Sequence, residues 1–242
     1  MAQILKNQKD NLIEILRKDI YKNINMINFI ENYPLTGFDN AGDSLLVKGK
    51  SDENWIYISS SSELELTQLL ENLNAEDKYF AIIEEWMEAI IIRQSTLEWK
   101  LSCVKYILPE NIKLPKNKCE VTRLTKDDAN YIYANYDYKN FSSPAYISER
   151  IVKDLSFGIM EDNKLVGWVL THDDGSIGLL NVLPEYRRKG YGYELMLAII
   201  RETRKVGKLP FLHIEENNIK STELALKLGF EKDRYVSWFK IS

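Results

Sequence analysis

A short basic stretch with two glycines is the part of the chain whose residue types suggest chemistry most directly. It consists of Arg187, Arg188, Lys189, Gly190, Tyr191 and Gly192. An apolar run typical of a strand, Ile177 to Val182, precedes it, and a helical pattern follows. A strand that turns through glycines into a helix directs backbone N–H groups and the positive end of the helix dipole at one point. The stretch therefore predicts an anion site that suits a phosphate.

Two better-known phosphate loops do not fit this stretch. It lacks the Gly-x-Gly-x-x-Gly pattern of dinucleotide-binding turns, and no Gly-Lys-Ser/Thr follows it as in a Walker loop. By itself the stretch is equally compatible with an ordinary strand–turn–helix connection that carries basic surface residues.

Two segments in sequence extend the pattern beyond the turn. Leu183-Pro-Glu-Tyr-Arg187 with the glycine turn resembles motif A of the GNAT superfamily, the acyl-CoA-dependent N-acyltransferases. The segment from Pro210 to Phe230, with Asn218 and Ser221, resembles that superfamily's motif B, in the matching order and at the matching separation. The resemblance is clear from about Ser176 to Phe230 and is not evident in the first half of the chain.

The resemblance implies that acetyl-CoA or another acyl-CoA binds at the turn. Backbone amides would hold the pyrophosphate, and the strand before the turn would splay from its neighbour and pair with the pantetheine arm. The implied cofactor-binding residues are Leu180, Asn181, Val182, Arg187, Arg188, Lys189, Gly190, Tyr191, Gly192, Asn218 and Ser221. A plain helix cap is the alternative role for Asn218, and a solvated helix start is the alternative for the basic side chains.

Amide formation from a thioester also needs a group that takes a proton from the acceptor's ammonium. The catalytic candidates are Asp174 before the 177–182 strand, His213 in an apolar strand, and Glu215 at the end of that strand. A solvated turn is the alternative for Asp174, and a packed, hydrogen-bonded ring is the alternative for His213. With two histidines and no carboxylate cluster in the sequence, we expect no metal site.

One position departs from the GNAT pattern. Many members carry a tyrosine in motif B that protonates the leaving thiolate, and Ala225 stands there. The missing tyrosine, the approach from Gly207 to Phe211 and the Trp238 strand resemble the glycine N-acyltransferase-like branch, which implies an amino acid or small amine as acceptor. Two alternatives stay open: a non-catalytic acyl-CoA sensor, and a phosphate-binding protein unrelated to CoA.

The composition narrows the class of protein. The chain has 242 residues, 45% hydrophobic and 28% charged, with a net charge of −4, an isoelectric point near 5.5 and two cysteines. These values are typical of a globular protein without a basic surplus for nucleic acid. No apolar stretch is long enough to span a membrane. We expect a cytoplasmic protein with reduced thiols, and the oligomeric state is left open.

The periodicities divide the chain into a predicted N-terminal α+β domain, 1–114, and a GNAT domain, 115–242. The irregular stretch 109–118 reads as a linker. The expected helices are 11–21, 63–73, 85–94, 126–136, 144–154, 191–206 and 218–228, and the expected strands are 44–47, 55–59, 79–83, 96–108, 119–124, 155–160, 165–171, 177–182, 211–214 and 235–241. From Cys119 onward this order predicts a mixed α/β domain around one sheet. It is also the order that the GNAT resemblance implies, and that resemblance implies an α/β GNAT fold, a mixed, mostly antiparallel sheet with splayed central strands. In the related branch the first half can be a degenerate GNAT-like copy.

Overall fold

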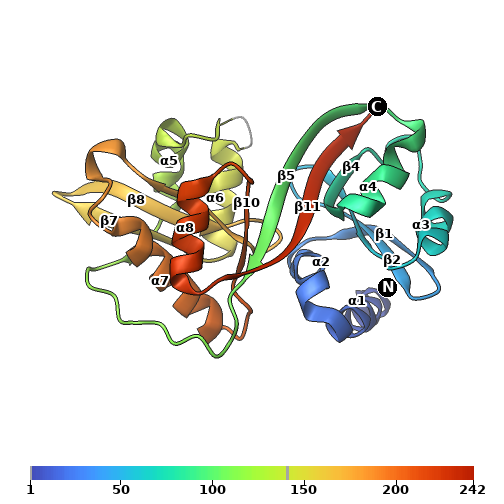
Figure 1. The fold of residues 1–242 in the computed structure, drawn as a ribbon, viewed down its shortest axis with the longest axis horizontal. Coiled ribbons are helices and arrows are strands. Elements are labelled where there is room, and N and C mark those ends of the chain that lie inside the picture. The colour runs from blue at the N-terminus through green and yellow to red at the C-terminus, as the bar shows by residue number, and fades with distance from the viewer. Residues whose placement is uncertain (1, 140–141) are drawn as a thin grey trace. The chain divides into compact units, whose positions relative to one another are not determined.

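The computed structural model describes residues 2–139 and 142–242. Its contacts divide the chain into two compact units (Figure 1). Unit 1 holds Met1–Lys105, Ile214–Asn217 and Asp233–Ser242, and unit 2 holds Tyr106–His213 and Asn218–Lys232. The last strand therefore belongs to the unit that the N-terminal half builds. The predicted boundary at 114/115 stays a prediction about independently folding domains.

Unit 1 is a sheet with helices on both faces. Its elements are α1 (Ala2–Leu16), α2 (Ile20–Asn32), β1 (Leu35–Ala41), β2 (Ser44–Lys50), β3 (Asn54–Ser59), α3 (Glu63–Leu70), β4 (Tyr79–Glu84), α4 (Glu85–Ile91), β5 (Leu97–Ile107) and β11 (Glu231–Ile241). The strand order is β1-β2-β3-β4-β11-β5. Alternation along the strands sends Val47 and Tyr57 to the core under α1 and α2, and Leu46 and Ile56 to the core under α3 and α4.

Local sequence accounts for most of these boundaries. The Asp19 side chain accepts a hydrogen bond from the Lys22 backbone N–H at 3.0 Å and starts α2, and Pro34 follows its end. Trp55 and Tyr57, which alternate along β3, are both buried. β1 was not predicted, because its polar sequence Leu-Thr-Gly-Phe-Asp-Asn-Ala is only half-buried along its length.

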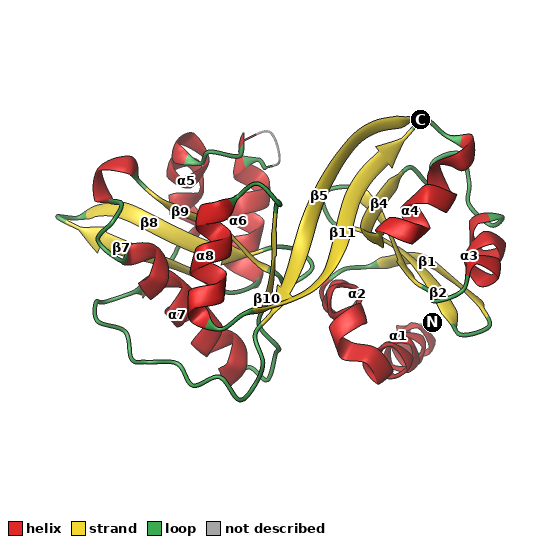
Figure 2. Cartoon of the chain, in the orientation of Figure 1, coloured by secondary structure: helices red, strands yellow, loops and turns green. Residues whose placement is uncertain are grey.

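Unit 2 is also a sheet covered on both faces. Its elements are β6 (Thr122–Arg123), α5 (Ala129–Asn135), α6 (Pro144–Lys153), β7 (Ser156–Glu161), β8 (Lys164–Thr171), β9 (Ile177–Val182), α7 (Tyr191–Lys205), β10 (Phe211–Ile214) and α8 (Ile219–Leu228). The order is β10-β9-β8-β7-β6, and β7, β8 and β9 run antiparallel side by side (Figure 2). The core over α5 and α6 includes Ile132, Ile147 and Trp168, and α7 contacts β7, β8 and β9.

Two predictions about this region need correction. The strand expected at 119–124 is only the two residues of β6. The stretch 109–118 is irregular as expected, but it is fastened along α7 and is not a loose linker: Arg204 donates to the Ile112 and Pro109 carbonyls at 2.6 and 2.7 Å, and Glu194 accepts from the Lys118 backbone N–H at 2.8 Å. Residues 140 and 141, between the helices expected at 126–136 and 144–154, lie outside the described residues.

The two halves of the chain repeat one order of elements. The series α1-α2-β1-β2-β3-α3-β4-α4-β5 has the same order as α5-α6-β7-β8-β9-α7-β10-α8-β11. The pairings agree as well: β2 with β3 and β8 with β9 are antiparallel, while β3 with β4 and β9 with β10 are parallel. The first half is therefore built on the GNAT-like plan of the second.

Candidate functional site

The basic glycine turn joins β9 to α7 as predicted. Arg188 has φ 66° and Gly190 has φ 86°, so both adopt the left-handed conformation that bends the chain into the helix. α7 is 15 residues long and begins at Tyr191 without a side-chain cap. The first N–H groups of a helix have no hydrogen-bond partners within the helix. These groups and the positive end of the helix dipole therefore point toward the space beside the glycine turn.

The two glycines leave space that the protein itself does not fill. A Cβ at Gly190 would have no heavy atom within 4 Å, and a Cβ at Gly192 would meet only Leu224 Cδ2, at 3.8 Å. Neither glycine is required by a close internal neighbour. The turn is a cradle that side chains at these positions would occupy, which fits a bound phosphate.

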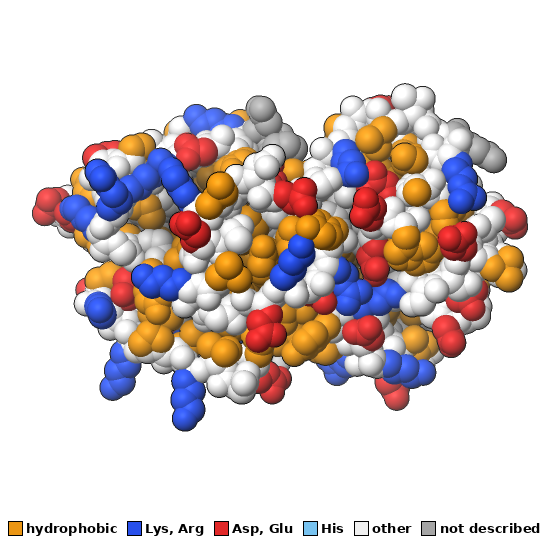
Figure 3. All heavy atoms as spheres, viewed as in Figure 1, with side chains coloured by type: hydrophobic (Ala, Val, Ile, Leu, Met, Phe, Trp, Pro, Cys, Tyr) orange, Lys and Arg blue, Asp and Glu red, His pale blue; other side chains and the backbone are white. Residues whose placement is uncertain are grey.

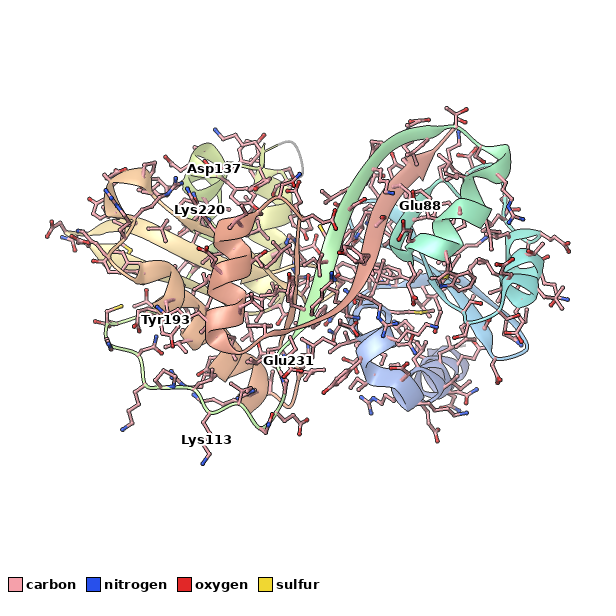
Figure 4. The ribbon with its side chains drawn as sticks, viewed as in Figure 1. Glu88, Lys113, Asp137, Tyr193, Lys220 and Glu231 are labelled. Atoms are coloured by element: carbon pink, nitrogen blue, oxygen red, sulfur yellow. The ribbon has the colours of Figure 1, made fainter. Side chains whose placement is uncertain are left out.

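The basic side chains of the turn are partly exposed, and hydrogen bonds and ion pairs hold them in place. Arg187 donates to the Val182 carbonyl at 2.8 Å and pairs with Asp137, labelled in Figure 4, at 3.2 Å. Lys189 Nζ and the Tyr191 hydroxyl both donate to the Glu161 carboxylate, at 2.8 and 2.6 Å. The hydrogen bonds from Lys189 and Tyr191 hold the pKa of Glu161 below its usual value. Lys and Arg side chains gather over this end of unit 2 in Figure 3.

β9 separates from β10 almost at once. The two parallel strands pair at Ile177 and Leu212 only, within the residues that the structure describes. On the other side β9 pairs with β8, and Leu179 has φ 47° where that register shifts. Such a bulge bends its strand. The predicted splay is present, and Leu180, Asn181 and Val182 lie on the strand that diverges.

Of these three residues, Asn181 has a structural role. Its side chain is 8% exposed, and Nδ2 donates to the Asn135 carbonyl at the end of α5, at 2.9 Å. The side chain thus ties β9 to α5, and any contact with a cofactor would come from its backbone.

α8 brings Asn218 and Ser221 to unit 2. Asn218 caps the helix, since its Oδ1 accepts from the Ser221 backbone N–H at 3.1 Å, and its Nδ2 lies 3.5 Å from the Tyr138 hydroxyl. Ala225 is 2% exposed, so this buried position presents no polar group. Tyr193 on α7, labelled in Figure 4, lies under Lys227 of α8, with Nζ 5.2 Å from its ring centroid.

A buried polar cluster lies at the start of β9. Asp174 is 2% exposed and accepts hydrogen bonds from the Ser176 backbone N–H and hydroxyl, at 2.9 and 2.6 Å. Burial alone would raise the pKa of Asp174, but the nearby His213 and His172 rings and the Ser176 hydrogen bonds outweigh it, and that pKa is lowered. Asp174 is therefore a buried, charged carboxylate and not a solvated turn residue. Of the predicted catalytic residues, Asp174 and His213 interact electrostatically, since the charge of His213 lowers the pKa of Asp174.

Two members of this cluster were missed from the sequence. His172 Nδ1 lies 3.1 Å from the Tyr146 hydroxyl on α6, and that hydroxyl lies 3.5 Å from Asp173 Oδ1. The run His172-Asp173-Asp174 was the available signal for the histidine. No local pattern marks Tyr146, because its place beside His172 depends on how α6 packs on the sheet.

The third catalytic candidate, Glu215, follows β10 and belongs to unit 1. Burial and the charge of Glu215 together raise the pKa of Cys103 to about 12. A role for Glu215 in proton transfer stays a prediction.

Within residues 2–139 and 142–242, no group of three or more His, Cys, Asp or Glu side chains is placed to hold a metal ion. None of the described helices combines the length and apolar character needed to cross a membrane.

The corresponding turn of unit 1 differs from the one in unit 2. α3 begins at a side-chain cap, Ser62, whose hydroxyl accepts from the Glu65 backbone N–H at 3.3 Å, and its first turn carries Glu63 and Glu65. β3 and β4 stay paired at three consecutive positions, starting from Trp55 and Tyr79. A capped, acidic helix start beside unseparated strands does not suit a polyanion.

Comparisons with known proteins agree with this geometry. Residues 156–239, roughly a third of the chain, match the family model described as FR47-like protein. No curated protein matches the sequence.

Several solved structures share the fold. A Drosophila protein is 18% identical with a TM-score of 0.79, covering 98% of this chain and 96% of that one. A GCN5-related N-acetyltransferase-like protein from Streptococcus suis is 13% identical with a TM-score of 0.59, covering 98% and 99%. A tandem GNAT protein from the clavulanic acid biosynthesis pathway, solved without AcCoA, is 13% identical with a TM-score of 0.51, covering 90% and 87%. The chain thus has the GNAT fold along its length, with an FR47-like segment at 156–239.

Proposed function

We propose that this protein is an acyl-CoA-dependent N-acyltransferase with one cofactor site, at the glycine turn of unit 2. The observation that carries the proposal is the uncapped α7 start, with an open glycine cradle, beside a β9 that leaves β10 after one pair. Backbone amides from Arg188 to Gly192 would bind the pyrophosphate. The backbone of Leu180 to Val182 would pair with the pantetheine arm.

An acyl-CoA supplies an activated thioester when it is bound, and the residues of the chain supply the rest. Lys189 lies at the cradle and forms an ion pair with Glu161. The ion pair holds this cation in place beside the proposed phosphate site. Asp174, His213 and Glu215 are the candidates from the sequence for the groups that assist the transfer of the acceptor's proton. With Ala225 buried, the thiolate leaves without help from that position; a free thiol pKa near about 8.5 makes this departure feasible in water.

The proposal also includes an acyl group and a class of acceptor. Acetyl is the acyl group we expect, and an amino acid or small amine is the acceptor, because the C-terminal half resembles the glycine N-acyltransferase-like branch in sequence. The family model that matches is FR47-like, so the branch itself remains a prediction. A cytoplasmic location and the absence of nucleic-acid or membrane partners also remain predictions.

Thermal unfolding with and without acetyl-CoA tests the cofactor site. At 100 times its dissociation constant, a ligand stabilises a protein by about 2.7 kcal/mol. We expect a higher midpoint for the wild type and no change for Gly190→Glu, whose side chain would enter the open cradle. An unchanged wild-type midpoint in a folded sample contradicts the proposal.

Thiol release from acetyl-CoA with a panel of amino acids and primary amines then tests the reaction. Binding without thiol release for any amine would favour the acyl-CoA sensor, the alternative that the alanine at position 225 keeps open.

A further inference from the structure

His172 lies where β9 leaves β10. Ile177 pairs with Leu212, so Gly178 and His213 are the first residues of the two diverging segments. The His172 ring covers Gly178: a Cβ there would lie 2.2 Å from Nε2. The absence of a side chain at Gly178 is what allows the imidazole to reach the opening of the splay.

The hydrogen bonds around the ring orient its protons. The Tyr146 hydroxyl lies 3.1 Å from His172 Nδ1 and 3.5 Å from Asp173 Oδ1. The hydroxyl oxygen accepts from the Asp173 backbone N–H at 3.3 Å. Because a carboxylate only accepts, the hydroxyl can give its proton to Asp173 Oδ1 while it accepts from Nδ1–H of His172. In the neutral ring this arrangement leaves the lone pair on Nε2, the nitrogen that faces Gly178.

Charged groups approach this ring from three elements. Asp173 and Asp174 flank it in the β8–β9 turn, and His213 comes from β10. From α6, beside Tyr146, the buried Arg150 donates to the Thr171 carbonyl at 3.0 Å and pairs with Asp154 at 3.2 Å. The buried Asp174 charge favours protonation of the two histidines, and Arg150, largely neutralised by Asp154, opposes it.

We propose that His172 Nε2 is the base that takes the proton from the acceptor's ammonium, and that Tyr146 with Asp173 is the positioning pair that holds the ring for it. This proposal rests on the proposed function and names the proton acceptor within that site. Asp174 then stabilises the imidazolium without itself becoming protonated.

The proton balance is closed by solvent and the leaving group. The ammonium gives one proton to Nε2, and the free amine nitrogen forms its bond to the thioester carbonyl carbon. The carbon–sulfur bond breaks, and the second nitrogen proton ends on the thiol sulfur. His172 returns its proton to solvent, so each turnover releases one amide, one thiol and one proton.

Nitrogen NMR of the imidazoles tests the ring orientation without an acceptor. The chain has two histidines, and His213→Gln assigns the signals. We expect the neutral His172 ring of the wild type to carry its proton on Nδ1, and Tyr146→Phe to shift the equilibrium toward the Nε2–H form. A wild-type ring protonated on Nε2 overturns the proposal.

Kinetics test the role in the reaction, with acetyl-CoA and the amine that gives the fastest thiol release. A general base contributes about 10²–10⁴-fold. We expect His172→Gln to lower kcat by about 100-fold, with the KM for acetyl-CoA unchanged and the rate regained at high pH, where the free amine is abundant. Gly178→Ala, which displaces the ring, should have the same profile.

Three results distinguish a failure of the His172 proposal from a failure of the proposed function. A His172→Gln enzyme with the wild-type rate and pH profile overturns the base while leaving the proposed function intact. If the wild type binds acetyl-CoA but releases no thiol with any amine, the role of His172 as base and the proposed transferase activity are both wrong. The proposed cofactor site would still stand. If His172→Gln does not fold, Tyr146→Phe must lower kcat by at least about 10-fold for the proposal to stand.

Discussion

Gly192 is a glycine whose presence the stability of its helix does not explain. It is the second residue of α7, where alanine is the better helix former, and a Cβ there would touch only Leu224 at 3.8 Å. The packing of unit 2 therefore gives no reason for glycine at this position. A ligand lying against the backbone does.

We predict that Gly192→Ala separates the two properties. Without ligand, the variant should be more stable than the wild type by about 0.5 kcal/mol, because alanine restricts the unfolded chain. With acetyl-CoA it should bind at least about tenfold more weakly, a loss of about 1.4 kcal/mol. Gly37→Ala is the matched control, since its Cβ would meet Lys48 Cδ at the same 3.8 Å in unit 1. Calorimetric titration measures the affinities of both variants for acetyl-CoA. Equal affinities for Gly192→Ala and the wild type would contradict the cradle.

Cys103 illustrates burial acting on one titratable group. It is 5% exposed, and burial with the Glu215 charge raises its pKa from 9.0 to about 12. Burial and the charge of Glu194 also raise the pKa of Cys119, which is half-buried. Since the folded-state pKa of Cys103 is the higher one, its contribution to stability is complete below pH 9.0 and is lost as the pH rises toward 12.

We predict that the folded protein reacts slowly with a disulfide reagent at pH 8. The thiolate fraction of Cys103 there is on the order of 10⁻⁴, so labelling should come from Cys119. Cys119→Ser should remove the slow labelling phase, and Cys103→Ser should leave it unchanged. If the wild type were labelled rapidly and Cys103→Ser were not, the Cys103 thiol would not be buried as described.

At the scale of elements, the irregular segment 109–118 is a strap on α7. Arg204 binds two of its carbonyls, and Ile112 packs on Gly229 so closely that a Cβ there would lie 2.9 Å from Ile112 Cγ2. Because α7 carries the glycine turn at its other end, the strap helps to fix the helix whose start would bind the cofactor.

We predict that Arg204→Ala releases the strap. Two charge-assisted hydrogen bonds are lost, which should destabilise unit 2 by about 2 kcal/mol. Hydrogen exchange measured by mass spectrometry should become faster across 109–118. Lys205→Ala is the control, since Lys205 makes an exposed pair with Glu202 and should change neither quantity measurably. Unchanged exchange in Arg204→Ala would mean that the strap does not depend on these bonds.

At the scale of the whole molecule, two copies of one plan have different turns. In unit 2 the helix starts at Gly190, beside basic residues and separated strands. In unit 1 it starts at Ser62 with Glu63 and Glu65, beside strands that remain paired. A polyanionic cofactor would be repelled by the second arrangement. The first half thus keeps the fold and lacks the features of the site.

We predict that each chain binds one acetyl-CoA. Calorimetry should give a stoichiometry near one per chain for the wild type. Gly190→Glu should abolish all binding, whereas Ser62→Ala, which removes the cap of α3, should lower stability by about 1 kcal/mol and leave binding unchanged. Residual binding in Gly190→Glu would reveal a second site and contradict the division of roles.

Local signals in the sequence determined most elements and the glycine turn. The Ile177–Val182 run, the glycines and the helix cap at Asn218 act through neighbours in the chain, so β9, α7 and α8 could be predicted. β1 could not, because an edge strand with a polar, half-buried sequence lacks an apolar pattern.

Only the tertiary structure decided which residues form the polar cluster and where the last strand belongs. Tyr146 and His172 are 26 residues apart and meet through the packing of α6 on the sheet. Asp174 precedes β9 and His213 lies in β10, so the pairing of Ile177 with Leu212 brings them near enough to interact electrostatically. β11 pairs with β4 in unit 1. These juxtapositions depend on strand pairing and helix packing between distant segments, and hydrophobic periodicity does not encode which segments will meet.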